Sequence, residues 1–235
     1  MSTLYPKPMS EDIRDLLKRK MRFAIANLKY DGAIKFAEKY RRLFMFDDNL
    51  LYELGLLYDH EANIAAKTNQ KRTGQYLEKA RSIYANLIKR NPKNFFALFG
   101  MARVYANKKE YQRAIHYAKR AYREKNKLPI GQKGALSVGS FYVWSGDFKG
   151  AERWYKKELK DLGGDEFGAF MNLLIFYNRI RKREKAYSLA FKAEKLMEKE
   201  FEKSVYKNLP VLKSKAMKIW KAEIQKARNW KPDKK

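Results

Sequence analysis

A small residue recurs at a fixed place in successive helical segments, and this recurrence restricts the fold more than any other feature. Residues 144–159 begin with a Gly-Asp turn and then place Phe148, Ala151 and Tyr155 at spacings of three and four. Similar patterns with alanines at corresponding places occupy residues 28–40, 107–122 and 181–196. A small residue at a fixed place lets a neighbouring helix approach closely, which predicts a helical array rather than one globular core.

The repeated segments resemble the tetratricopeptide-repeat (TPR) family, whose unit is a helix pair of about 34 residues with a W-x2-L-G-x2-Y…A-x3-F…P type pattern. In one copy, "LLYELGLLY" supplies Leu54, Gly55 and Tyr58, and the following helix supplies Ala80 and Pro92. The five copies that can be placed span about 14–47, 48–94, 95–131, 132–166 and 167–200. The resemblance implies an all-α fold: a right-handed superhelix of about five TPR-like helix-turn-helix repeats with a C-terminal capping helix.

Individual copies depart from the family pattern in ways that carry structural expectations. Copy one has Lys20 and Met21 where Leu and Gly are usual, which suits a terminal, partly capping repeat. Copy two has extra residues near 60–74, which predict either a protruding loop or an extended first helix. In copy four, the small residues Gly139 and Ala151 indicate that the two helices of the repeat cross at these positions.

The ends of the chain lie outside the repeats. Residues 1–13 form an N-terminal segment, and residues 201–230 contain an amphipathic helix that begins near Pro210. This helix is expected to cover the apolar face of the last repeat. The tail at 231–235 is predicted to be disordered. No segment shows sustained alternation of apolar and polar residues, so almost no strand is expected.

Residue types needed for several kinds of chemistry are missing or scattered. The chain has no cysteine, which excludes disulfides, thiolate metal sites and cysteine nucleophiles. Its two histidines, His60 and His116, belong to different copies, so no metal site is expected. No catalytic constellation can be assembled. We therefore expect no enzymatic activity, no cofactor and no small-molecule substrate.

The N-terminus and the apolar stretches show no targeting pattern. The first twenty residues lack a basic region followed by an apolar one, so no signal peptide is expected. The longest apolar stretch, around "NFFALFGMARVYA", is too short to span a bilayer. Together with the absence of cysteine, these features predict a cytoplasmic protein.

The charge is large and unevenly distributed. Lys and Arg total 53 against 26 Asp and Glu, a net charge of +27. Residues 1–59 carry a net charge of +2, residues 60–180 carry +14, and residues 181–235 carry +11. Such a field favours an anionic partner, which could be nucleic acid, an anionic membrane or an acidic protein. The alternative is a lysine-rich solvated surface.

The TPR resemblance implies that the first helix of each repeat lines a concave, partner-binding groove. The groove positions are Lys18, Arg22, Tyr52, Glu53, Asp59, Phe96, Phe99, Arg103, Trp144, Met171, Asn172 and Asn178. Lys18 fits the family's set of Lys, Arg and Asn residues that grip a terminal carboxylate, but Glu53 and Gly100 do not, so no carboxylate clamp is expected. An aromatic groove suits a peptide or helix with apolar anchors. Alternatively, Phe96, Phe99 and Trp144 pack between neighbouring repeats or under the C-terminal helix.

The second helices carry a recurring basic residue, which we call the basic ladder. The twenty-ninth position of the copies holds Arg42, Lys89, Arg123, Lys160 and Lys195. Three residues earlier, on the same helix face, stand Lys39, Asn86, Arg120, Lys157 and Lys192. Stacked helices would align these cations along an outer surface that matches a polyanion. Alternatively, the cations only complement the helix dipole.

These observations favour a non-enzymatic adaptor or scaffold that binds a protein or peptide in its groove, with a basic outer face attracted to an acidic partner or assembly. Direct binding of RNA or a ribonucleoprotein is the alternative, although the sequence lacks an RNA-recognition signature. A third alternative is peripheral association with an anionic membrane through the lysine-rich C-terminal helix.

Overall fold

The structure is a computed structural model that describes residues 15–16, 19–20, 23, 30–39, 47–124, 137–161, 167–201 and 210–230. Within these ranges the regular elements are all helices, as the sequence predicts. The chain divides into two compact units, residues 1–127 (unit 1) and residues 128–235 (unit 2), which are described separately. The segments 1–13 and 231–235 lie outside the described residues.

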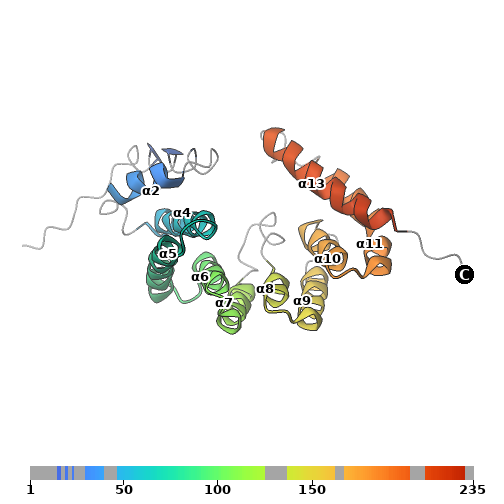
Figure 1. Cartoon of the computed structure of the whole chain (residues 1–235), viewed down its shortest axis with the longest axis horizontal. Helices are drawn as coiled ribbons and strands as arrows, with labels where there is room; N and C mark the ends of the chain where they lie inside the picture. The colour runs from blue at the N-terminus through green and yellow to red at the C-terminus, as the bar shows by residue number, and fades with distance from the viewer. Residues whose placement is uncertain are drawn as a thin grey trace, which may run out of the picture. The chain divides into compact units, whose positions relative to one another are not determined.

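Unit 1 contains consecutive antiparallel helix pairs (Figure 1). Its helices are α2 (Tyr30–Lys39), α4 (Asp48–Ala65), α5 (Gln70–Arg90), α6 (Phe95–Asn107) and α7 (Tyr111–Glu124). Helix α4 packs on α5, and α6 packs on α7, while α5 and α4 each contact α6. The hydroxyl of Tyr58, which is fully buried on α4, donates a hydrogen bond to Glu38 on α2.

Unit 2 repeats the arrangement and ends with the predicted capping helix (Figure 1). Its helices are α8 (Val138–Trp144), α9 (Phe148–Asp161), α10 (Phe167–Arg179), α11 (Arg183–Phe201) and α13 (Pro210–Arg228). Helix α13 packs on α11 and α10, where it buries Ile224 and Ala227. Trp220 meets the ring of Phe167 edge-on at 4.5 Å. The helix therefore covers the apolar face of the last repeat, as expected.

Close approach of helices occurs where the sequence places small residues. Ala151 on α9 is fully buried, and Gly139 on α8 lies against the ring of Tyr155. A Cβ atom added at Gly139 would lie 2.7 Å from Cε1 and 2.9 Å from Cγ of Tyr155. In unit 1 the fully buried Tyr84 fills the same kind of space, between Gly55 on α4 and Gly100 on α6.

The extra residues of copy two lengthen both of its helices. Helix α4 continues to Ala65, and α5 starts at Gln70 after a short turn. Asn69 caps the start of α5 by accepting a hydrogen bond from the backbone N–H of Arg72 at 2.9 Å. Of the two alternatives left by the sequence, the extended first helix is the one observed, and the second helix is extended as well.

The turn inside a repeat uses one left-handed residue. This residue is Lys109 in copy three (φ 63°), Gly146 in copy four (φ 83°) and Arg181 in copy five (φ 57°). After Lys109, the N–H of Glu110 donates to the carbonyl of Tyr105 at 2.9 Å, which completes a Schellman motif at the end of α6. Only glycine adopts this conformation without steric cost, so two of the three turns hold strained residues.

Replacing Lys109 with glycine is therefore expected to stabilise unit 1 by about 0.5–1 kcal/mol, because the removal of left-handed strain outweighs the larger entropy of the unfolded glycine chain. Urea unfolding followed by circular dichroism measures this change. Lys108→Gly, one residue earlier and outside the left-handed region, is the matched control and is expected to be destabilising. Equal destabilisation by both variants would contradict the assignment of strain to Lys109.

Candidate protein-binding surface

The aromatic groove residues of unit 1 meet across two first helices. Tyr52 on α4 and Phe96 on α6 have ring centroids 5.1 Å apart. Phe99, one turn after Phe96, stacks on Phe95 with a centroid distance of 6.2 Å. Phe95 is buried, whereas Tyr52, Phe96 and Phe99 are half-buried. The three half-buried rings, which we call the aromatic strip, combine inter-helix packing with partial exposure to solvent. A role of these rings in partner binding stays a prediction.

One groove cation of unit 1 is neutralised within the fold. Arg103 on α6 forms an ion pair with Asp59 on α4 at 2.8 Å, and the Nδ2 atom of Asn107 donates to Asp59 at 3.0 Å. Asp59 is fully buried, and this burial raises the pKa of its carboxyl above the usual range despite the opposing effect of Arg103. Burial also raises the pKa of Tyr52 to about 12. Arg103 therefore links α4 to α6 instead of offering an unpaired charge to a partner.

The groove residues of unit 2 have different environments. Trp144 is 46% exposed and meets Phe141 edge-on at 5.2 Å. Met171 is only 2% exposed, so the prediction that it is an exposed groove residue is wrong: its side chain joins the core of unit 2. Asn172 is half-buried. Asn178 donates to the backbone carbonyl and to the carboxylate of Glu223 on α13, at 2.9 and 2.8 Å, so the capping helix occupies this position.

Three sequence-predicted site residues lie outside the described residues. They are Lys18 and Arg22 of the groove and Arg42 of the basic ladder. Their roles stay predictions.

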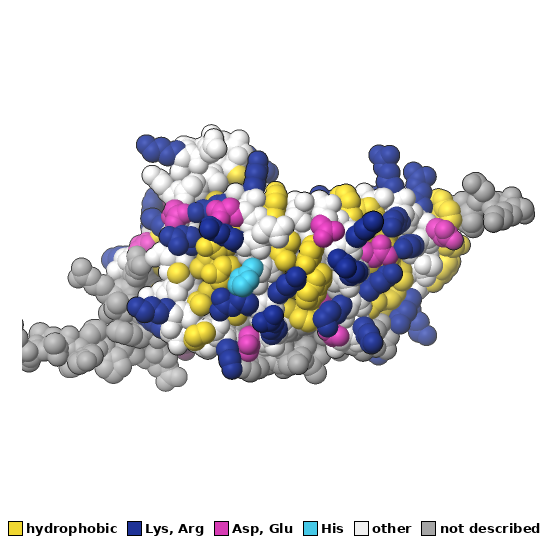
Figure 2. Space-filling model, turned by 90° about the horizontal axis from the view of Figure 1, so that it is seen from below, with side chains coloured by type: hydrophobic (Ala, Val, Ile, Leu, Met, Phe, Trp, Pro, Cys, Tyr) yellow, Lys and Arg dark blue, Asp and Glu magenta, His cyan; other side chains and the backbone are white. Residues whose placement is uncertain are grey.

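The described members of the basic ladder lie on second helices and are mostly exposed. Lys89 and Arg123 are exposed near the ends of α5 and α7 in unit 1, and Lys160 and Lys195 are exposed on α9 and α11 in unit 2. Lys89, Arg123 and Lys160 each lie in the last turn of their helix, where a cation also interacts favourably with the helix dipole. Lys195 does not lie in the last turn of α11, so the dipole does not account for it. Figure 2 shows many Lys and Arg side chains and fewer Asp and Glu on the face that it displays.

The earlier row of the ladder makes more internal contacts. Arg120 lies over the ring of Tyr117 at 5.4 Å, and Lys192 lies over the ring of Phe170 at 5.6 Å. Lys157 forms an ion pair with Asp161 at 2.9 Å. These cations are held by their own helices or by neighbouring helices, so they contribute less to an open cationic surface than the later row does.

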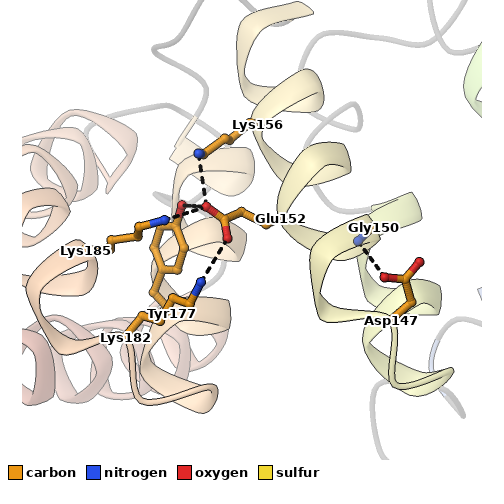
Figure 3. Close-up of polar contacts among 7 residues, drawn as sticks. All are labelled: Asp147, Gly150, Glu152, Lys156, Tyr177, Lys182 and Lys185. Carbon is orange, nitrogen blue, oxygen red and sulfur yellow. Dashed lines mark hydrogen bonds and ion pairs between the residues drawn. The ribbon is translucent and has the colours of Figure 1, made fainter.

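Sequence reasoning missed an acidic hub that joins copies four and five. Glu152 on α9 forms ion pairs with Lys156 at 3.0 Å, Lys182 at 3.4 Å and Lys185 at 2.8 Å (Figure 3). It also accepts a hydrogen bond from the hydroxyl of Tyr177 at 3.0 Å. Hydrogen bonds from Lys185, Lys156 and Tyr177 lower the pKa of Glu152 to about 2. In the sequence, only the four-residue spacing between Glu152 and Lys156 indicated one of these contacts. The other partners lie on α10 and at or near the start of α11, so the local sequence of α9 could not predict them.

Glu152→Gln is expected to destabilise unit 2 by about 1–2 kcal/mol at neutral pH, a value reduced by solvent screening of the half-exposed lysines. A carboxyl whose folded pKa is depressed stabilises the fold above its unfolded pKa of about 4.3 and loses that contribution as pH falls towards 2. The difference between wild type and variant should therefore shrink over this window. Urea titrations across pH test it, with the exposed Glu198→Gln as control; a difference independent of pH would contradict the ionic role.

A second buried carboxylate was also missed. Glu158 on α9 is 3% exposed, and it accepts hydrogen bonds from the backbone N–H of Val138 at 2.6 Å and from the hydroxyl of Ser137. It therefore caps the start of α8 from the partner helix of the same repeat. The sequence around Glu158 did not predict this cap. The distance between the Glu158 carboxylate and the start of α8 depends on how closely the two helices pack in the tertiary structure.

The described parts of the chain show neither a metal-ligand cluster nor a membrane-spanning helix. No group of three or more His, Asp or Glu residues there could hold a metal ion. Among the described helices, none is both long and apolar enough to cross a membrane. Asp59, Glu152 and Glu158 are each engaged in ion pairs or hydrogen bonds that join neighbouring helices.

Comparison with solved structures identifies the fold. A Podosopora anserina protein with nearly identical TPR-like repeats superimposes with a TM-score of 0.57 at 14% identity, covering 82% of this chain and 99% of that one. A double mutant of MamA RS-1 gives 0.51 at 16% identity, with 80% and 97% covered. A MamA structure from Desulfovibrio magneticus RS-1 gives 0.50 at 17% identity, with 81% and 96% covered.

No protein-family model and no curated protein matches the sequence. At identities this low, structural likeness concerns the fold alone. The helix pairs of this chain and its superposition on a structure with TPR-like repeats nevertheless both show that the chain has the tetratricopeptide-repeat fold. The resemblance inferred from the repeated small residues is confirmed.

Proposed function

We propose that this chain is a non-enzymatic adaptor that binds a protein or peptide partner on the concave side of its repeats. The observation that supports this most is the aromatic strip on α4 and α6. Its rings expose apolar surface on the first helices of adjacent repeats, where TPR proteins bind their partners. Half-buried aromatic side chains are rigid anchors because little side-chain entropy remains to be lost on binding.

The partner chemistry that suits the strip is a peptide or helix with apolar side chains at regular spacing. Arg103 and Asp59 neutralise one another at 2.8 Å, so this end of the strip offers little net charge. Recognition there therefore depends on apolar contact, while the surplus of cations elsewhere accelerates encounter with an acidic partner.

A selection from a displayed peptide library tests this proposal with the full chain. Selected peptides are expected to carry aromatic or branched apolar anchors and to lose at least tenfold in affinity for the double variant Phe96→Ala/Phe99→Ala. Phe191→Ala, which removes a ring that is 53% exposed on α11, is the control and is expected to retain binding. Equal affinity for wild type and the double variant would contradict the proposal. A large fall in the melting temperature of the double variant would instead assign the rings to packing.

Nucleic-acid binding through the basic ladder is the second candidate, favoured by the exposure of Lys89, Arg123, Lys160 and Lys195. Phosphate contacts release counterions, so log affinity for a single-stranded oligonucleotide would fall with log salt by about 0.7 per contact. The triple variant Arg123→Glu/Lys160→Glu/Lys195→Glu would abolish such binding. No detectable binding near physiological salt would reject this candidate.

Peripheral membrane attachment is supported least. Lys218, Lys221 and Lys226 are exposed on α13, but the same helix packs its buried Ile224 and Ala227 on unit 2. Over residues 217–230, where the side chains of this segment are described, a bilayer would meet lysines and the exposed Ile219 rather than a continuous apolar face.

A further inference from the structure

Unit 2 contains a pocket of about 800 Å³ between the α10–α11 turn and the C-terminal part of α13. Its walls include Arg179 and Arg181 from the end of α10 and the turn, Arg183 from the start of α11, and Lys226 from α13. The groove and ladder positions chosen from the sequence contain none of these four cations, although residues 179–185 form a visible basic run.

The charge of the pocket is not balanced from within. The one carboxylate in its lining, Glu223, accepts a hydrogen bond from Asn178 at 2.8 Å. Among the described residues, no carboxylate lies within ion-pair distance of Arg179, Arg181 or Arg183. The nearby Lys182 and Lys185 differ in this respect because each of them forms an ion pair with Glu152. A cavity lined by cations concentrates the positive potential within it.

The walls of the pocket are fixed by contacts that do not involve the four cations. Asn178 ties α10 to Glu223 on α13, and Arg228 forms an ion pair at 2.6 Å with Glu194 on α11. At the turn, the N–H of Lys182 donates to the carbonyl of Tyr177 at 3.0 Å, which holds the preceding residue in its left-handed conformation. The cationic side chains therefore project from a framework that is already formed before a ligand arrives.

The pocket also has an apolar component. Ile175 on α10 and Trp230, just beyond the end of α13, line it, and both are half-buried. Trp230 is supported by Tyr187 on α11, whose ring it meets edge-on at 5.8 Å. A ligand for this pocket must combine negative charge with an apolar group, because cations and apolar side chains share the same lining.

We propose that this pocket binds an acidic segment of the partner protein, in which an apolar side chain lies among glutamates or aspartates. Guanidinium groups bind carboxylates through paired hydrogen bonds, and Arg179, Arg181 and Arg183 supply them from one wall while Lys226 supplies charge from another. Charges distributed over two walls match carboxylates spaced along a chain, and the apolar lining matches the apolar side chain. This inference rests on the proposed adaptor function and adds a second contact to it.

The test measures binding of a fluorescein-labelled peptide of glutamates with a central leucine to the full chain by fluorescence anisotropy. The double variant Arg179→Glu/Arg183→Glu is expected to weaken binding at least tenfold. Its matched control, Lys67→Glu/Lys93→Glu, makes the same change of net charge at exposed sites in unit 1 that belong neither to the groove nor to the basic ladder, and it is expected to weaken binding less than threefold. Circular dichroism melting verifies that both variants are folded.

Three results would overturn the inference. Equal loss in the two double variants would show that the peptide responds to overall charge. Tighter binding of inorganic tripolyphosphate or an oligothymidylate at the same arginines would show that the ligand is a phosphate compound. Unchanged affinity when serine replaces the central leucine of the peptide would show that the apolar side chain does not contribute to binding.

The same assay separates this inference from the proposed function. Phe96→Ala/Phe99→Ala is expected to leave binding of the acidic probe unchanged, because the aromatic strip belongs to unit 1. Failure of the acidic probe with intact binding of library-selected peptides would reject the pocket alone, and the converse would reject the groove alone.

Discussion

Gly139→Phe and Ala151→Phe are each expected to lower the free energy of unfolding of unit 2 by about 3 kcal/mol or more, at the upper end of the effects of overpacking. A Cβ atom at Gly139 would already lie 2.7–2.9 Å from the atoms of the Tyr155 ring, and Ala151 has no exposed surface. A phenyl group at Gly139 must therefore separate α8 from α9 or expel Tyr155 from the core, and one at Ala151 must displace the core side chains that enclose it.

Chemical denaturation of the variants measures this effect, and the same new side chain at an exposed site supplies the control. Lys149→Phe on α9 adds a phenyl group to the solvent-facing side of the helix and is expected to change stability by less than about 0.5 kcal/mol. If Gly139→Phe and Ala151→Phe unfold at the same denaturant concentration as Lys149→Phe, the assigned helix crossing is wrong.

Removing the ring of Tyr84 is the second large perturbation. Tyr84→Ala is expected to cost about 3–5 kcal/mol because the ring is fully buried between α4 and α6. Gly100→Ala is expected to cost about 1–3 kcal/mol, since its Cβ atom would lie 2.5 Å from Cζ of Tyr84. The control Gly74→Ala has open space around it in α5 and is expected to stabilise by about 0.5–1 kcal/mol through helix propensity.

The two large changes are expected to compensate one another in part. The cavity left by Tyr84→Ala can hold the methyl group of Gly100→Ala, so the double variant should be more stable than the sum of the single changes predicts. A double-mutant cycle from urea unfolding gives this coupling directly. Additive costs within about 0.5 kcal/mol would mean that the two residues do not share the space that the structure assigns to them.

Residues that define the repeat could be read from the sequence because helix pairs are local structures. The spacing of Gly139, Ala151 and Tyr155 depends only on the helical period and on the contact between two consecutive helices. The predicted capping helix also followed from a local amphipathic pattern. The extension of copy two was left open because the polar residues 67–73 suit either a helix or a loop, and the cap at Asn69 decides where α5 starts.

Side-chain environments at the groove were harder to predict because they depend on neighbouring helices. Alignment of the sequence with the repeat pattern of the family predicted that Met171 is exposed in the groove, but the adjoining helices of unit 2 bury it. The same alignment placed Arg103 in the groove without showing that the buried Asp59, one repeat earlier, neutralises it at 2.8 Å. The count of charged residues likewise showed that the chain is basic. It could not show that Lys185 pairs with Glu152 while Arg179, Arg181 and Arg183 line the pocket beside α13.

The sequence by itself determined the helix pairs, the small residues at their crossings and the excess of positive charge, because periodicity, residue volume and ionisation are properties of the residues. Only the tertiary structure decided which cations form ion pairs and which line the pocket beside α13. Ion pairing acts over a few ångströms, and only the packing of α9 against the next repeat brings Glu152 within 2.8 Å of Lys185, which lies 33 residues further along the chain.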